Sequence, residues 1–217
     1  MKKNALIVAA GKGKRMNADI PKQFLLLNDF PILMHTLNAF ADFDKRILVL
    51  PKSQIENWKS LCKDYNFELE HILVDGGINR FSSVKNGLRQ VDEESIVAIH
   101  DGVRPLISKN LTNKLIAATK KGIGVVPVIP IKDSLRKIEG NKSKAISRSS
   151  LYKVQTPQCF FASTIKNAYR QNFSLFFTDD ASVLESNGGK IISILGEEQN
   201  IKITTKGDLR IAEFFMQ

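Results

Sequence analysis

The feature that most constrains the fold of this chain is an apolar run at residues 5–10 that ends in a glycine-rich polar loop. Gly11 and Gly13 allow backbone N–H groups to turn toward an anion, because no Cβ stands in the way. Arg15 offers a planar fork of donors, and Lys22 offers a mobile point charge. The pattern predicts a buried strand followed by a loop that binds phosphate groups.

The spacing of the two glycines separates this loop from two better-known phosphate loops. A dinucleotide fingerprint GxGxxG needs a third glycine at position 16, where the chain has Met16. A Walker A loop needs GxxxxGK[ST], and Gly11 and Gly13 lie too close together for it. The pattern GxGxRM followed by PK resembles that of sugar nucleotidyltransferases, which bind a nucleoside triphosphate. An ordinary glycine turn with solvated basic neighbours is the alternative.

Short apolar runs alternate with amphipathic segments along most of the chain. We expect strands over residues 47–50, 69–74, 96–99, 123–128, 190–195 and 201–204, and helices over 31–40, 53–62, 111–119, 162–172, 178–185 and 208–215. This alternation predicts an α/β fold with a mostly parallel sheet, in which the loops at the carboxyl ends of the strands hold the ligand.

A second glycine loop supports that expectation. Gly76 and Gly77 follow the strand expected at 69–74, and Ser83 lies in the helix start that comes next. Close backbone approach at Gly77 and the hydroxyl of Ser83 are suited to reading the edge of a base. The alternative is an ordinary turn with a capping serine.

Two charged side chains follow the strand expected at 96–99. Asp101 suits the recognition of polyol hydroxyl groups, and Arg104 suits the recognition of a phosphate. A mutual salt bridge of structural importance is the alternative interpretation of this pair.

The alternation breaks down at residues 131–154, which we interpret as a protruding β-arm on a single domain that comprises residues 1–217. Between positions 132 and 153 there are seven basic and two acidic residues, so half of the net charge of +10 lies in this segment. The alternative is a basic, solvated hairpin whose charges only prevent edge-to-edge aggregation.

The composition limits the class of protein. The basic balance allows nucleic-acid binding, but the chain has no run of five basic residues and no RNP-like pattern, so we expect small polyanionic ligands instead. The apolar run at 5–10 is too short for a signal peptide, and no run approaches the length of a membrane span. Cys62 and Cys159 lie in unlike contexts, which predicts no disulfide framework and a cytoplasmic protein.

Six separated stretches stand in the order and spacing of one known family. They are GKGKRMNADIPKQF, VDGGINRFSSV, HDGVRP, VQTPQCF, TDDAS and NIKITTKGDL. The chain resembles the 2-C-methyl-D-erythritol 4-phosphate cytidylyltransferases of the non-mevalonate isoprenoid pathway from end to end. The resemblance implies a Rossmann-like α/β sandwich whose β-arm interlocks in a homodimer. Ribitol-5-phosphate cytidylyltransferases are similar and form the alternative, and Gly102-Val103 stands where the methylerythritol enzymes commonly have two alanines.

The same resemblance implies roles for individual residues. The implied CTP-binding residues are Ala9, Ala10, Gly11, Gly13, Gly77 and Ser83, and the implied catalytic cations are Arg15, Lys22 and Lys202. The implied contacts of the sugar phosphate are Asp101, Arg104, Ser134, Arg148 and Thr156, with Ser134, Arg148 and Thr156 supplied by the partner subunit. The family often has threonine at the position of Ser134, and serine keeps the hydroxyl.

The implied reaction explains this set of residues. A phosphate monoester has a second pKa of about 6, so it is largely dianionic at neutral pH and needs no general base. His35, His71 and His100 therefore need no catalytic role. We expect Arg15, Lys22 and Lys202 to neutralise charge, with Mg²⁺ held mainly by CTP phosphates and by no protein ligand set. A binding module without catalysis is the remaining alternative, and three cations around one phosphate argue against it.

Overall fold

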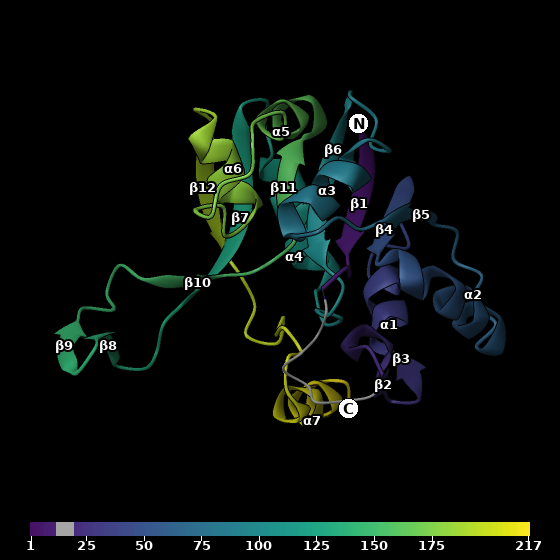
Figure 1. The fold of residues 1–217 in the computed structure, drawn as a ribbon, viewed down its shortest axis with the longest axis horizontal. Helices are drawn as coiled ribbons and strands as arrows, with labels where there is room; N and C mark the ends of the chain where they lie inside the picture. The colour runs from purple at the N-terminus through teal and green to yellow at the C-terminus, as the bar shows by residue number, and fades with distance from the viewer. Residues whose placement is uncertain (12–19) are drawn as a thin grey trace.

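The computed structural model describes residues 1–11 and 20–217, and its centre is an eight-stranded sheet (Figure 1). The strand order is β10-β7-β11-β6-β1-β4-β5, and β12 pairs with β7. The strands are β1 (Lys2–Val8), β4 (Lys45–Leu50), β5 (Ile72–Asp75), β6 (Ser95–Asp101), β7 (Ile123–Pro130), β10 (Tyr152–Val154), β11 (Gln158–Phe161) and β12 (Lys190–Leu195). Six of them share one direction, and only β10 and β11 oppose it. The predicted Rossmann-like, mostly parallel sheet is confirmed.

Helices cover both faces of the sheet. They are α1 (Ile32–Asn38), α2 (Ile55–Asp64), α3 (Arg80–Leu88), α4 (Lys109–Ala118), α5 (Ala162–Ala168), α6 (Asp180–Ser186) and α7 (Lys206–Phe215). Alternate residues of β1 belong to different cores, because side chains alternate across a strand. Ile7 packs in the core that contains Leu33 of α1 and Trp58 of α2. Leu6 packs in the core that contains residues of α3, α5 and α6.

A smaller third core lies beyond the carboxyl end of the sheet. There, Leu27 packs with Val103, Ile203 and Ala212. Leu27 belongs to the short strand β2 (Leu26–Leu27), which lies beside β3 (Phe30–Pro31), and Ala212 belongs to α7. The prediction of a strand over residues 201–204 is wrong, because this segment crosses the end of the sheet and does not pair with a strand. It is held by single contacts such as the hydrogen bond from Ile203 N to Val103 O at 2.9 Å.

Strand β11 is an element that the sequence did not indicate. Residues 155–158 are mostly polar, yet Gln158 begins a strand that lies between β6 and β7 and runs against both. Cys159 and Phe160 are fully buried in it, on opposite faces of the sheet. A strand of four residues is too short to show a period, so its pairing is set by the surrounding sheet.

The predicted arm leaves the sheet between β7 and β10. Strands β8 (Leu135–Glu139) and β9 (Lys142–Ile146) form a hairpin that projects away from the sheet (Figure 1). Strand β10, the last part of the segment predicted as the arm, pairs with β7 and so joins the arm to the central sheet. The part of the arm between the sheet strands is thus residues 131–151.

Two further expectations concern cysteines and membranes. Cys62 and Cys159 are both free thiols, and Cys159 is buried. Across residues 1–11 and 20–217, no helix is both long enough and apolar enough to cross a bilayer.

Candidate active site

A cleft of about 680 Å³ opens at the carboxyl edge of the sheet. It is lined by residues that directly follow β1, β4 and β5 and by Asp101 at the end of β6. Strand β1 lies between β4 and β6, so chain connections leave this part of the sheet in opposite directions. Such a reversal leaves a crevice outside the strand ends, and ligands of open α/β sheets bind in it. The cleft therefore lies at the edge of the sheet where the sequence predicts the ligand-binding loops.

Eight of the predicted site residues line the cleft. They are Ala9, Ala10, Gly11, Lys22, Gly77, Ser83, Asp101 and Lys202. Arg104 lies behind Asp101 and contacts it. Thr156 is buried beside Asp101 of its own chain and accepts a hydrogen bond from Asp101 N, so the implied supply of Thr156 by the partner subunit is wrong. Ser134 and Arg148 are exposed on the arm and do not line the cleft of their own chain. Gly13 and Arg15 lie outside the described residues.

The end of β1 and the residue that follows it, Ala9, are held in place by their neighbours. Gln23, buried in the short helix η2 (Lys22–Phe24), donates from Nε2 to Ala9 O at 3.1 Å. Gly102 N donates to Val8 O at 2.9 Å, and a Cβ built on Gly102 would lie 2.8 Å from the Cβ of Ala9. Gly102, which stands where the family commonly has alanine, therefore fits the close approach of the chain segments that follow β1 and β6.

The second glycine loop is shaped by Ser83. Ser83 Oγ accepts a hydrogen bond from Gly77 N at 3.0 Å and donates to Asn79 O at 2.8 Å. The capping function that we considered for Ser83 belongs to Asn79, which forms a capping box with Ser82. A Cβ on Gly77 would overlap Ser82, so the loop requires glycine there. Ser83 thus fixes the backbone that faces the cleft, and base reading by Ser83 stays a prediction.

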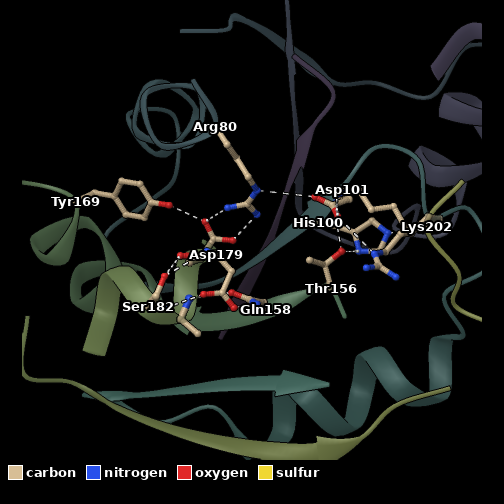
Figure 2. Close-up of polar contacts among 12 residues, drawn as sticks. Arg80, His100, Asp101, Thr156, Gln158, Tyr169, Asp179, Ser182 and Lys202 are labelled. Carbon is tan, nitrogen blue, oxygen red and sulfur yellow. Dashed lines mark hydrogen bonds and ion pairs between the residues drawn. The ribbon is translucent and has the colours of Figure 1, made fainter. Parts of the chain in front are cut away.

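Asp101 is the centre of the charged cluster in the cleft (Figure 2). Its Oδ2 lies 2.9 Å from Lys202 Nζ and 3.4 Å from Arg104 Nε, so the salt bridge that we considered for Arg104 does form. Its Oδ1 lies 3.9 Å from Arg80 Nε. Burial opposes ionisation of this carboxyl, but the nearby cations Lys202, Arg80 and Arg104 outweigh it and hold the pKa of Asp101 far below its usual range. Asp101 is a carboxylate at any physiological pH.

A chain of hydrogen bonds behind Asp101 fixes its backbone. Thr156 Oγ1 accepts from Asp101 N at 3.0 Å and lies 3.1 Å from Nδ1 of His100. His100 Nε2 lies 2.9 Å from Arg104 O. Complete burial lowers the pKa of His100 to about 4, so the ring is neutral and its contacts assign the proton to Nε2. The structure therefore gives His100 a bracing function, in agreement with the expectation that the reaction needs no base.

The segment that carries Lys202 is held by side chains of the same network. Arg104 Nη1 donates to Asn200 O at 2.8 Å, and Asn200 Nδ2 donates to Thr156 O at 2.8 Å. Gln155 Nε2 also donates to Asn200 O, at 3.2 Å. These contacts place the Lys202 ammonium group beside Asp101.

Arg80 is a cleft residue that the sequence reasoning missed. It lines the cleft and forms a bidentate ion pair with Asp180, at 2.9 and 2.7 Å. Arg80 is the first helical residue after the glycine loop of Gly76 and Gly77, and this position beside a predicted ligand-binding loop could have indicated a cleft residue. Asp180 was interpreted only as part of a helix start, and the capping residue there is its neighbour Asp179.

The described residues of the cleft offer few ligands for a divalent cation. Asp101 is the single acidic side chain among the described residues that line it, and its oxygens already face three cations. No group of three or more potential ligand side chains occurs within residues 1–11 and 20–217. The donor set of these described residues suits a cation that is carried by phosphate oxygens.

Comparison with known proteins gives the family. The family model for 2-C-methyl-D-erythritol 4-phosphate cytidylyltransferase matches residues 4–217. The chain belongs to this family. A 2-C-methyl-D-erythritol 4-phosphate cytidylyltransferase from Azobacteroides pseudotrichonymphae is 50% identical over 217 residues, which cover 97% of each chain. The protein of that name from Bacteroides fragilis is 45% identical over 215 residues and 98% of each chain.

Solved structures of the same family share the fold. The crystal structure of the 2-C-methyl-D-erythritol 4-phosphate cytidylyltransferase from Thermus thermophilus matches with a TM-score of 0.83 at 29% identity. The match covers 99% of this chain and 98% of that one. The family match and the named relatives support the methylerythritol assignment, and the ribitol alternative is not favoured.

Proposed function

We propose that the protein, a nucleotidyltransferase by its family, joins CTP and 2-C-methyl-D-erythritol 4-phosphate to give 4-diphosphocytidyl-2-C-methyl-D-erythritol and pyrophosphate. The observation that carries the proposal is the meeting of Gly11, Lys22, Asp101 and Lys202 in one cleft at the carboxyl edge of the sheet. The reaction needs donors for a triphosphate and a recognition group for a polyol, and the cleft offers both.

The nucleophile in this reaction is the phosphate of the sugar alcohol. Its second pKa is about 6, so it reaches the cleft as a dianion and can attack the α-phosphorus of CTP without losing a proton to the protein. The main difficulty is the approach of two anions and the charge that develops on the five-coordinate phosphorus. Lys22 and Lys202 line the cleft and would stabilise that charge more strongly in the transition state than in the ground state.

The remaining residues would bind and orient the two substrates. The backbone of Ala9, Ala10 and Gly11 would hold the triphosphate, and the loop of Gly77, fixed by Ser83, would hold the cytosine. Asp101 would accept hydrogen bonds from polyol hydroxyl groups. Arg15 and Gly13 complete the proposed phosphate loop. Arg104 and Thr156 of the same chain, with Ser134 and Arg148 of a second copy, complete the proposed sugar-phosphate set.

Mg²⁺ is part of this proposal as a cation that arrives with CTP. When bound, it supplies charge neutralisation on the triphosphate and assists departure of pyrophosphate. Lys22 and Lys202 would lie around the same phosphates, while Asp101 keeps its partners in the protein.

The arm leads us to propose a homodimer in the cytoplasm. Ser134 and Arg148 are exposed on the arm beside the hairpin of β8 and β9 and do not line their own cleft, so a sugar-phosphate contact by them requires a second copy of the chain. An exposed, strongly basic hairpin also suits delivery to an anionic substrate.

Pyrophosphate release tests the proposed function. We expect release with CTP and 2-C-methyl-D-erythritol 4-phosphate, and none above background with CTP and D-ribitol 5-phosphate. CTP alone controls for hydrolysis. Release with ribitol phosphate alone would replace the proposed substrate, and no release with either polyol phosphate would reject the cytidylyltransferase assignment.

A further inference from the structure

Arg80 lies between two acidic side chains at the edge of the cleft (Figure 2). Its two terminal nitrogens donate to the two oxygens of Asp180, at 2.9 and 2.7 Å. Its Nε lies 3.9 Å from Asp101 Oδ1. A single guanidinium group therefore connects the first residue of α3, the first residue of α6 and the last residue of β6.

Asp180 is a rigid anchor for this guanidinium. Its side chain is fully buried, and Oδ1 also accepts a hydrogen bond from the Tyr169 hydroxyl at 2.6 Å. Burial, together with the charge of Asp180, raises the pKa of Tyr169 well above its ordinary value, so the hydroxyl stays a donor. A bidentate pair of this kind fixes the plane of the guanidinium as well as its position.

The start of α6 is itself tied to the sheet. Gln158, at the start of β11, donates from Nε2 to Asp179 Oδ2 at 2.8 Å and accepts from Ala181 N at 2.9 Å. Asp179 caps the helix through Ser182 N. The two chain neighbours of Asp180, Asp179 and Ala181, are thus both hydrogen-bonded to Gln158 of β11, which fixes the backbone that carries the Asp180 carboxylate.

The contacts of Asp101 are divided between its two oxygens. Oδ2 faces Lys202 at 2.9 Å and Arg104 at 3.4 Å, whereas Oδ1 faces Arg80. A carboxylate with cations on one oxygen only can rotate about its Cβ–Cγ bond, and a fixed cation at the second oxygen opposes that rotation. Arg80, at the start of α3, supplies this second cation at Oδ1.

We propose that Arg80 is a positioning residue: held by Asp180 and Tyr169, it keeps the Asp101 carboxylate in the orientation that accepts hydrogen bonds from the sugar phosphate. The inference rests on the proposed function, which assigns polyol recognition to Asp101. Arginine is required because one planar fork grips Asp180 with two nitrogens and still presents Nε to Asp101, whereas lysine has a single ammonium group.

Three substitutions test the proposal in graded order. Arg80→Lys is expected to raise KM for 2-C-methyl-D-erythritol 4-phosphate roughly tenfold to a hundredfold, because misplaced substrate contacts have effects of that size. Asp180→Asn, which keeps the shape and loses the charge, should raise it less, and Tyr169→Phe should raise it least. KM for CTP should change by less than about twofold in all three, since the lost contact concerns the second substrate.

Arg46→Lys is the matched control. Arg46 of β4 donates to three backbone oxygens, Glu70 O, Ala41 O and Phe43 O, near the start of the strand and away from the cleft. Its replacement should lower the melting temperature and leave both KM values unchanged. Equal increases in the two KM values of Arg80→Lys, or an increase for CTP alone, would overturn the positioning role.

A structural readout separates this inference from the proposed function. In a crystal structure of Arg80→Lys, the Asp101 carboxylate should rotate and its distance from Lys202 Nζ should change from the wild-type arrangement. An unchanged carboxylate would overturn the inference even if the wild type makes the expected product. A rotated carboxylate in a protein that does not turn over methylerythritol phosphate would support the inference and reject the proposed substrate.

Discussion

Replacement of Lys22 by alanine is expected to lower kcat roughly a hundredfold to a thousandfold, the cost of one preorganised charge at a transition state. Lys22 begins η2 directly after Pro21, so its backbone leaves the loop in a restricted direction, and it lines the cleft together with Gly11 and Lys202. Because its charge acts mainly on the five-coordinate phosphorus, kcat should fall more than KM for CTP rises. Steady-state kinetics with both substrates varied measures the two parameters.

The matched control for Lys22 is another lysine outside the cleft. Lys59 is exposed on α2 and pairs with Glu56 at 2.7 Å, an arrangement that contributes little to stability. Lys59→Ala should therefore keep kcat near the wild-type value while changing the net charge by the same amount. If Lys22→Ala were as active as Lys59→Ala, with its fold intact by circular dichroism, Lys22 would have no catalytic role.

The arm provides a prediction of recovered activity. Arg148 is exposed on the arm, just after β9, and donates to Lys132 O of the same arm. The hairpin of β8 and β9 projects away from the sheet (Figure 1). If Arg148 serves the neighbouring subunit, Arg148→Ala should raise KM for the sugar phosphate far more than KM for CTP. A heterodimer of Arg148→Ala with Lys22→Ala would then have one site with both lesions and one with neither.

Subunit mixing measures this arrangement directly. In an equal mixture after exchange, half of the dimers are heterodimers with one intact site of two, so about a quarter of the wild-type activity should return. A mixture of Lys22→Ala with Lys202→Met is the control, because both residues line the cleft of one chain and every site keeps a lesion. Absence of recovery for the Arg148 mixture, with exchange verified by mass spectrometry, would place Arg148 in its own chain's site or outside any site.

The sequence predicted those parts of the site that depend on the ends of strands. Gly11, Gly77 and Asp101 each lie at or just after the end of an apolar run, and parallel strands bring such ends to one edge. The division of successive β1 side chains between two cores likewise follows from the period of a strand. Lys202 required the family resemblance, because its segment crosses the edge without regular secondary structure.

The rest of the site depends on contacts that no local pattern records. Arg80 and Asp180 are separated by 100 positions and meet only because α3 and α6 begin on the same side of the sheet. Strand β11 has four residues and takes its antiparallel direction from β6 and β7. The basic charge pattern of the arm continues into Lys153, which pairs with Ile129 of β7, so the charge pattern alone does not locate where the arm joins the sheet.

The central claim is that the phosphate of the polyol attacks the α-phosphorus of CTP in this cleft. The most direct measurement uses methylerythritol phosphate with ¹⁸O in its phosphate group and unlabelled CTP, followed by mass spectrometry and ³¹P NMR of the products. We predict that all of the label stays in 4-diphosphocytidyl-2-C-methyl-D-erythritol, that one labelled atom forms the bridge between its two phosphorus atoms, and that pyrophosphate carries none. Labelled pyrophosphate, or CMP in place of the diphosphate product, would contradict the account.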